Sequence, residues 1–535
     1  MSKLRGDEDL FAVLEDLSSA QGYAHEAPKS EEMPPSPETS RPAKRKRLSS
    51  DIPDYPSNKP AGNPAIWNPY VQIDVSSGPT RCLAPTNPQV EVFRRRAFER
   101  FKDKVKDIFE RATANSTKQG PANLWRELQV VSLMERWHFA AKLAEIQMLQ
   151  RTQPLEQLTT SLEWRTHQVH HFIENASTEQ RWVDPILISE PTGKKGEIKK
   201  PAENVLLEEI KFDWRRAWNR TRDVERKNDN IEPVFESKKF KSKSRTVIGG
   251  VKAVGFEVMA TFRKDLAKRA QEETLQTARK RKNLPKVTHK EEVSVTFSGL
   301  TFSINRQHFD KVVVLFDRQN QDCQSREERE AGFLSSLFCL LARYDMLQGA
   351  GLQAALPGAV FDVLLTLYGC NLECFASPLN CRYERFFSAF PDTDAPFGSL
   401  GSFFDHNFTQ GGSYQANPPF VARFIHAMYE KMEQSLSSCV EPLMFVVFIP
   451  AWSEAPAWKT LRESPHLQQY VLVDQSSHYY TEGTQHRRKS SKRIASFNTS
   501  VFFLQNEAGK DKWKIDSSQV EELKRAFALD PAIAD

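Results

Sequence analysis

The sequence predicts an α/β protein in its C-terminal half, preceded by a mainly helical region and a disordered tail. Residues 1–62 are rich in Pro, Ser, Glu and Lys, a composition that buries too little apolar surface to fold. Residues 63–285 carry apolar side chains at helical spacing. In residues 286–535, strand-like runs alternate with helix-like segments, which is typical of a sheet with crossover helices. Hydrophobic residues make up 39% of the 535, enough for at least one sizeable core.

The tail contains two segments with a pattern of their own. Asp9–Leu17 has leucines at helical spacing and is interpreted as a short docking helix or as a transient helix without a partner. Arg41–Arg47 is a dense basic cluster, either a solvated charge block or a nuclear-import signal. Its flanking Pro and Ser favour import, so a nuclear location is expected. No apolar secretory leader or run of about 20 apolar residues is present, so no membrane partner is expected.

The helical region becomes basic toward its end. The runs Val90–Phe98 and Leu124–Leu149 place apolar residues three or four apart, as amphipathic helices do. Lys238–Lys290 holds 16 Lys and Arg against four Asp and Glu. This excess indicates either a solvated helical face or a surface that attracts phosphates.

The α/β region is predicted from short apolar runs. The predicted strands are Val293–Phe297, Glu373–Ala376, Ser413–Ala416, Met444–Ile449, Gln469–Val473 and Val501–Leu504. Lys311–Phe316 is either a strand or the core side of a helix, and Arg382–Phe390 is expected to be a helix. A further helix is predicted from an apolar stripe of Val421, Phe424, Ile425, Met428 and Met432. Because Met444–Ile449 is apolar throughout, we expect a sheet covered on both faces.

The tetrapeptide Asn417-Pro418-Pro419-Phe420 lies between a predicted strand and a predicted helix, where α/β sheets bind ligands. The Asn417 side-chain carbonyl and the Pro418 backbone carbonyl can accept the two hydrogens of the adenine exocyclic amine. These bonds would localise the lone pair of a poor nucleophile. Consecutive prolines hold the carbonyls rigidly, and the Phe420 ring can stack on the base. The alternative is a Pro-rich turn, but the strand–helix context favours methyl transfer to the amine.

A site for the cofactor S-adenosylmethionine is expected upstream of the tetrapeptide. Two Gly-containing turns, Gln348–Gln353 and Phe397–Gly401, are candidates, although neither is a clean GxGxxG. Ala376–Asn380 follows a predicted strand, and the Asn380 amide can bond a ribose. Cys370, Cys374 and Cys381 are interpreted as reduced buried thiols, and no metal site is predicted.

Long motifs in the last 200 or so residues resemble one family, the cap-specific adenosine-N6 methyltransferases known as phosphorylated CTD-interacting factor 1. The matching segments are Gly351–Pro357, Glu373–Cys381, Ser388–Asp394, Phe397–Ser399, Ala416–Phe420, Val447–Pro450 with Trp452, and Phe503–Asn506. The resemblance implies a Rossmann-like S-adenosylmethionine-dependent methyltransferase core with an associated helical domain. It implies a catalytic role for Asn417, Pro418, Pro419 and Phe420. It also implies a cofactor pocket formed by Gln353, Asn380, Phe397, Gly398, Asn417 and Pro418.

The implied reaction is N6-methylation of the 2′-O-methyladenosine next to the cap of mRNA. The capped 5′ end is therefore the expected partner. A second implied partner is the RNA polymerase II C-terminal tail, but vertebrate members bind it through an N-terminal WW domain. No pair of tryptophans with the required spacing is found in the first 90 residues, where Trp67 stands alone. Two alternatives stay open: a catalytically inactive protein that binds capped RNA or the polymerase, and an enzyme acting on internal adenines.

Overall fold

The computed structural model describes residues 88–114, 133, 206–212, 214–215, 231–275, 285–288, 292–320, 325–347, 354–487 and 492–528. Several sequence predictions lie outside these residues: Asp9–Leu17, the basic cluster Arg41–Arg47 with its nuclear role, the position of Trp67, Leu124–Leu149 except Leu133, and the Gly-containing turn Gln348–Gln353. They stay predictions.

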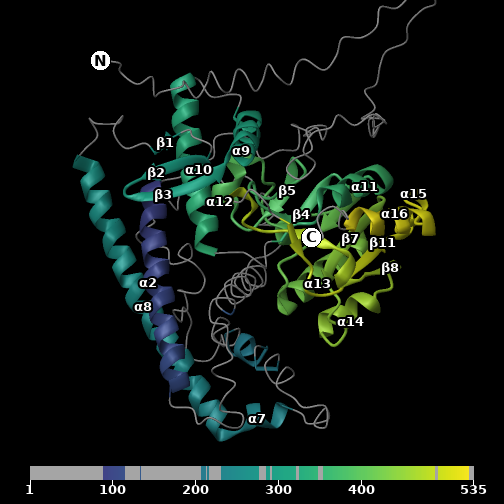
Figure 1. The fold of residues 1–535 in the computed structure, drawn as a ribbon, viewed down its shortest axis with the longest axis horizontal. Coiled ribbons are helices and arrows are strands. Elements are labelled where there is room, and N and C mark those ends of the chain that lie inside the picture. The colour runs from purple at the N-terminus through teal and green to yellow at the C-terminus, as the bar shows by residue number, and fades with distance from the viewer. Residues whose placement is uncertain are drawn as a thin grey trace, which may run out of the picture.

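A six-stranded mixed sheet forms the centre of the α/β region (Figure 1). From edge to edge its strands are β5 (Arg385–Ser388), β4 (Leu372–Ala376), β6 (Gly412–Ala416), β7 (Leu443–Pro450), β11 (Thr499–Gln505) and β8 (Leu467–Val473). Strands β5, β4, β6 and β7 run parallel. Strand β11 is antiparallel to both β7 and β8, so β8 runs in the same direction as β7. The α/β class predicted from the sequence is confirmed.

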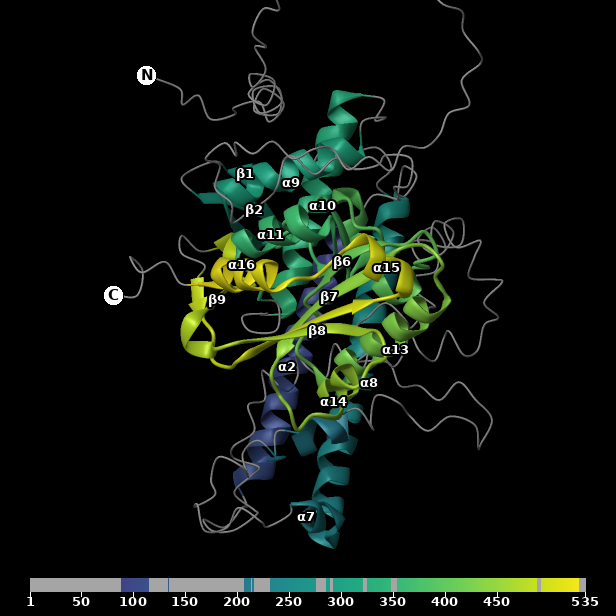
Figure 2. The same cartoon turned by 90° about the vertical axis from the view of Figure 1, so that its right-hand side faces the viewer.

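Both faces of this sheet are buried, as the apolar strand predicted. Every residue of β7 is buried, and its side chains alternate between two hydrophobic cores. Phe445 and Val447 face the core that includes α13 (Ala422–Ser438) and α14 (Pro456–Arg462). Val446 faces the core that includes α11 (Gly358–Tyr368) and α16 (Ser517–Phe527). Figure 2 shows α16 on one side of the sheet and α13 and α14 on the other.

The helical region contains two long helices that pack side by side, α2 (Pro88–Ala114) and α8 (Lys238–Leu275) (Figures 1 and 2). They are antiparallel, because Arg100 pairs with Asp265 and Lys104 with Glu257. The buried side chains recur at helical spacing along each helix: Phe101, Val105 and Phe109 on α2, and Phe240, Val247, Val251 and Val258 on α8. The exposed Lys and Arg of α8 therefore lie away from the helix–helix contact.

A small antiparallel sheet of β1 (Lys286–Thr288), β2 (Glu292–Phe297) and β3 (Leu300–Asn305) follows α8. The β2–β3 turn uses Ser298 and Gly299, both at positive φ, as the type I′ turn of a two-residue hairpin requires. The Asn305 side chain then caps α9 (Arg306–Gln319) by accepting from the His308 N–H at 2.9 Å. The run Lys311–Phe316 lies in α9, so it is the core side of a helix. Helix α10 (Arg326–Leu347) follows and packs on α2.

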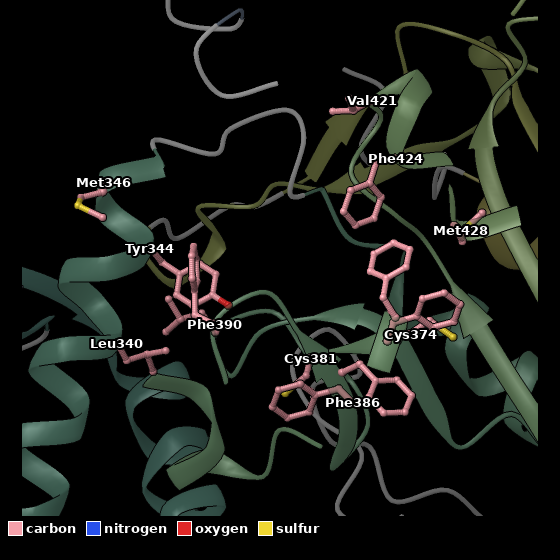
Figure 3. Packing of buried hydrophobic residues seen from close by; sticks show 14 of the residues in the cluster. Leu340, Tyr344, Met346, Cys374, Cys381, Phe386, Phe390, Val421, Phe424 and Met428 are labelled. Atoms are coloured by element: carbon pink, nitrogen blue, oxygen red, sulfur yellow. The ribbon is translucent and has the colours of Figure 1, made fainter. Parts of the chain in front are cut away.

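One secondary-structure prediction is wrong. The segment Arg382–Phe390 was expected to be a helix, but Arg385–Ser388 forms the edge strand β5 and pairs in parallel with β4. Its aromatic residues fit a helical spacing equally well, and burial against the sheet decides between the two forms. Figure 3 shows Phe386 of β5 in the buried cluster with Cys374 and Cys381. The other predicted strands and the α13 stripe are confirmed.

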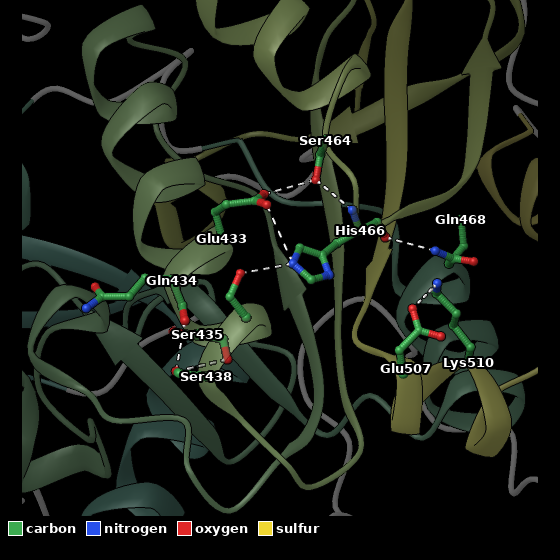
Figure 4. A network of polar contacts seen from close by, with 10 residues as sticks. Glu433, Gln434, Ser435, Ser438, Ser464, His466, Gln468, Glu507 and Lys510 are labelled. Atoms are coloured by element: carbon green, nitrogen blue, oxygen red, sulfur yellow. Dashed lines mark hydrogen bonds and ion pairs between the residues drawn. The ribbon is translucent and has the colours of Figure 1, made fainter.

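The remaining described elements are short. They are α7 (Glu232–Glu236), α12 (Pro391–Asp394), η5 (Ala395–Phe397), η6 (Phe403–Asp405), η7 (Gln475–Ser477), β9 (Tyr479–Thr481), η8 (Gln485–Arg487), β10 (Lys492–Ile494) and α15 (Glu507–Lys512). A polar network joins α13 to the segment between α14 and edge strand β8 (Figure 4). In it, the Glu433 carboxylate accepts from the Ser464 hydroxyl at 3.0 Å and lies 3.5 Å from the His466 ring nitrogen.

Candidate active site

The strand order creates one place in the described sheet where a ligand site is expected. After β4 the chain adds β5 on one side, and it then returns to add β6 on the other side of β4. This reversal is a topological switch point, and α/β sheets bind ligands there, beyond the carboxyl ends of the strands. The segments that leave these two ends are Ser377–Asn380 after β4 and Asn417–Phe420 after β6. The structure therefore brings the predicted tetrapeptide and the predicted ribose residue, Asn380, to the same edge.

Asn417 is held in a defined orientation at this edge. Its side-chain N–H donates to the backbone carbonyl of Ala354 at 2.7 Å. Since that carbonyl can only accept, the other half of the amide must be the oxygen. The Oδ1 atom is buried and has no hydrogen-bond partner among the described residues. A buried acceptor without a partner is costly, so this atom is suited to a donor supplied by a ligand.

The two prolines and Phe420 make the segment after β6 rigid. The Pro419 carbonyl accepts from the Val421 N–H at 2.7 Å, which closes a tight turn before α13. Pro418 is buried. The Phe420 ring is only 6% exposed and packs edge-on against Phe497, with ring centroids 5.5 Å apart. Phe420 thus belongs to the hydrophobic core beneath the site, and its stacking on a base stays a prediction.

The turn after β4 is organised by Asn380. Its side-chain oxygen accepts from the Ser377 N–H at 2.7 Å and from the Ser377 hydroxyl at 2.9 Å. The Asn380 N–H in turn bonds the Ser377 carbonyl at 3.1 Å. The oxygen of this amide is therefore occupied within the turn. A hydrogen bond between Asn380 and a ribose stays a prediction. It would use the amino group of the side chain, because the oxygen already accepts from Ser377.

Two buried charged residues next to this turn were not identified from the sequence. One oxygen of Glu373, in β4, accepts from the N–H groups of Arg382 and Tyr383 at 2.6 and 2.8 Å. Lys311, in α9, donates to the carbonyls of Leu379 and Cys381 at 3.1 and 3.2 Å. The only signals for these two residues in the sequence are a lysine at the start of an apolar run and a glutamate within a predicted strand.

Burial disfavours the charged forms of both groups. It raises the pKa of the Glu373 carboxyl to about 7, although the N–H groups of Tyr383 and Arg382 and the Lys311 ammonium act in the opposite direction. Burial likewise lowers the pKa of Lys311, against the effect of Cys381 and Glu373.

Two predicted pocket residues lie elsewhere. Phe397 is fully buried, and its ring packs 5.8 Å from that of Phe316. Gly398 has a φ of +98°, and a Cβ placed there would lie 3.4 Å from the Glu384 carbonyl. Glu384 precedes β5, so Gly398 lies at the amino end of that strand. The structure does not bring this pair to Asn417, and their cofactor role stays a prediction.

Other predicted features are placed as follows. Gln353 lies outside the described residues, directly before Ala354. Cys370, Cys374 and Cys381 are buried free thiols. Among the described residues, no group of three or more His, Cys, Asp or Glu is arranged to hold a metal ion. In the same part of the chain, no helix has the length and apolar character needed to cross a membrane.

The fold and the site define an α/β protein with a polar ligand site at the switch point of a mixed sheet. Comparison with known proteins specifies the family. Residues 311–483, which include Lys311, Glu373 and Asn417, match the family model described as "Phosphorylated CTD interacting factor 1 WW domain". This segment is therefore similar to the phosphorylated CTD interacting factor 1 family, the resemblance that the sequence predicts. In this chain the matched residues run from α9 to beyond β9.

Two curated relatives are each described as an mRNA (2′-O-methyladenosine-N(6)-)-methyltransferase. The proteins from Homo sapiens and Mus musculus are both 38% identical to this chain, over 245 and 246 residues respectively. The matches cover 44% of this chain and 34% of each relative. The chain thus spans about a third of the length of the curated relatives it matches.

Proposed function

We propose that this protein is a methyltransferase with a Rossmann-like core that uses S-adenosylmethionine to methylate N6 of the 2′-O-methyladenosine next to the cap of mRNA. The observation that carries the proposal is the Asn417 side chain at the carboxyl end of β6. Its Nδ2 is fixed by the Ala354 carbonyl, and its buried Oδ1 has no partner. An isolated, oriented acceptor is what an amine nucleophile requires. The relatives' printed activity supports the same reaction.

The residues at the switch point fit the cofactor. S-adenosylmethionine, when bound, supplies an electrophilic methyl group. The turn Ser377–Asn380 and the pair Asn417–Pro418 would hold it along the carboxyl ends of β4 and β6. In addition to Asn417 Oδ1, both polar atoms of the buried Gln415 amide lack a hydrogen-bond partner among the described residues. Unsatisfied buried polar atoms at a ligand edge are consistent with a bound polar molecule.

The chain's own residues account for activation of the amine. Asn417 Oδ1 would accept one amine hydrogen and the Pro418 carbonyl the other, which draws the nitrogen toward a tetrahedral geometry. As positive charge develops on the nitrogen, the two acceptors stabilise it without reorganising. The proton leaves from a cationic nitrogen, so no strong base is required. The rigid Pro418-Pro419 backbone keeps the acceptors in place throughout.

Methyl transfer to a short RNA that begins with capped 2′-O-methyladenosine tests this function. We expect transfer from S-adenosylmethionine in the presence of EDTA, and much less transfer to the same RNA without its cap. Calorimetric titration should show cofactor binding under the same metal-free conditions. Cofactor binding without methyl transfer would favour the inactive capped-RNA binder. Equal methylation of capped and uncapped RNA would favour an enzyme for internal adenines.

The basic face of α8 is proposed to attract the RNA backbone. Lys238, Lys239 and Arg245 are exposed, whereas Phe240, Val247 and Val251 of the same helix are buried. Changing all three to glutamate should weaken RNA binding. It should also reduce the slope of log affinity against log salt by about 0.7 for each lost phosphate contact. Fluorescence anisotropy at several salt concentrations measures both quantities.

A matched triple variant distinguishes an effect of the α8 face from a general effect of net charge. Lys512, Lys514 and Arg525 are also exposed, and they lie near α15 and α16 on the far side of the molecule (Figure 1). Their change to glutamate alters the net charge equally and should leave the salt dependence close to that of the unmodified protein. Equal slopes in the two triple variants would show that the α8 residues only face solvent.

A further inference from the structure

The backbone that leaves the carboxyl end of β4 is held from two sides by buried ionisable side chains. The Lys311 ammonium bonds the carbonyls of Leu379 and Cys381, and the Glu373 carboxylate bonds the N–H groups of Arg382 and Tyr383. The two side chains come from different elements, α9 and β4. Because they bind opposite polar groups of consecutive residues, they fix the position and the direction of residues 379–383.

The same five residues are also tied to α11. The Arg382 guanidinium pairs with Asp362 at 2.9 Å, and the Tyr383 hydroxyl donates to the Phe361 carbonyl at 2.6 Å. Asn380 completes the turn through its bonds to Ser377. The backbone of this turn is therefore specified by polar contacts from three elements.

The chemistry of Lys311 argues against a role in stability alone. Lys311 is only 3% exposed, and taking an ammonium out of water is costly even when it is paired. An apolar side chain of similar length would avoid this cost, and such replacements of buried charges are often neutral or stabilising. What an apolar side chain cannot do is hold the two carbonyls. The lysine therefore contributes the placement of the turn.

We propose that Lys311 and Glu373 are positioning residues that set the affinity for the cofactor by clamping residues 379–383, which lead from the turn at the carboxyl end of β4 back to the amino end of β5. This inference rests on the proposed function, since it assigns the turn to the S-adenosylmethionine site. Neither residue touches the reacting atoms. Each acts through the backbone it holds. Substituting either residue should therefore change the affinity for the cofactor and leave the affinity for RNA unchanged.

Calorimetric titration of the full-length chain with S-adenosylhomocysteine tests the clamp. Binding to the unmodified protein comes first, because its absence would contradict the proposed function and not the clamp. We expect Lys311→Met to weaken binding by about 10- to 100-fold, the effect of losing charge-assisted hydrogen bonds. In turnover, KM for S-adenosylmethionine should rise by a similar factor, while kcat at saturating cofactor and RNA affinity stay unchanged.

Two further variants separate positioning from folding. Glu373→Gln keeps an oxygen that can accept both N–H groups and should restore most of the affinity that Glu373→Leu loses. Arg329→Met removes a half-buried cation that ties the same helix, α9, to α10 through a 2.6 Å bond between Arg329 and Asp317. This control should lower thermal stability without changing cofactor affinity. A folded Lys311→Met protein with unchanged affinity, or an equal loss in Arg329→Met, would overturn the proposal.

Hydrogen exchange on the unmodified protein provides a measurement that does not depend on any variant folding. The amides of Arg382 and Tyr383 already bond Glu373. If the clamped turn contacts the cofactor, saturating S-adenosylhomocysteine should slow their exchange by about tenfold or more. The exchange rates of the amides of α16, which packs against α11 on one face of the sheet, should change much less. No added protection at residues 379–383 in a protein that binds the ligand would overturn the proposal.

Discussion

Asn417→Ala is expected to lower the rate of methyl transfer by about 10²- to 10³-fold, the usual cost of removing one preorganised polar contact to a reacting group. The substitution removes the buried Oδ1 acceptor and leaves the Pro418 carbonyl as the remaining acceptor for the amine hydrogens. The protein should stay folded, because the side chain makes one hydrogen bond in the structure. Single-turnover kinetics with saturating cofactor and capped RNA measure the chemical step directly.

Asn417→Asp tests the orientation of the amide. From the sequence alone, aspartate would retain more activity than alanine, because it keeps an acceptor and adds a favourable negative charge. The structure changes this expectation. A carboxylate oxygen would replace the donor that lies 2.7 Å from the Ala354 carbonyl, so two acceptors would face each other. We therefore expect the aspartate variant to lose about tenfold or more in rate as well, and to bind the cofactor less tightly than the alanine variant.

Asn320→Ala is the matched control for both variants. The Asn320 amide also donates to backbone carbonyls, those of Phe316 and Pro396 at 2.7 and 3.0 Å, but it lies at the end of α9. Its removal should leave the rate within about threefold of the unmodified protein, as for a surface substitution away from the site. If Asn417→Ala folds normally and methylates capped RNA at the original rate, the proposed mechanism is wrong and the tetrapeptide is only a turn.

The second large effect concerns stability. Glu91→Ala is expected to reduce the free energy of unfolding by about 3 to 5 kcal/mol, because it leaves a buried guanidinium group without its counter-ion. Glu91 and Arg343 have side chains only 6% and 5% exposed, and the pair joins α2 to α10 with a 2.5 Å bond. Arg94 forms a second ion pair with Glu91. The effect should appear as a lower midpoint in urea unfolding.

Glu99→Ala provides the comparison on the same helix. Glu99 pairs with Arg95 at 2.6 Å, but its side chain is 46% exposed, so water replaces the lost contact. Its removal should cost less than about 1 kcal/mol. Similar losses in the two variants would mean that the Glu91–Arg343 pair is not desolvated in solution. A two-step transition in Glu91→Ala alone would show that α2 separates from the α/β core when this pair is broken.

The sequence by itself determined the features that depend on neighbours in the chain. The α13 stripe follows from a period of 3.6 residues and the strand Met444–Ile449 from a short, continuous apolar run, and both are local properties. The place of Asn417–Phe420 between a strand and a helix is confirmed, while the chemistry that their residue types indicate stays a prediction. The local pattern of Arg382–Phe390 fits both a helix and a strand. The predicted helix is wrong, because pairing with β4 selects the strand.

Only the tertiary structure decided the features that join distant residues. The orientation of Asn417 depends on a carbonyl 63 residues earlier, and the Lys311 ammonium reaches carbonyls 68 and 70 residues later. The antiparallel strand β11 enters between β7 and β8, an order that no apolar run encodes. The physical reason is that hydrophobic periodicity records which face of an element is buried but not which partner buries it. A buried lysine or an unpartnered amide oxygen acquires meaning only when the surrounding atoms are in place.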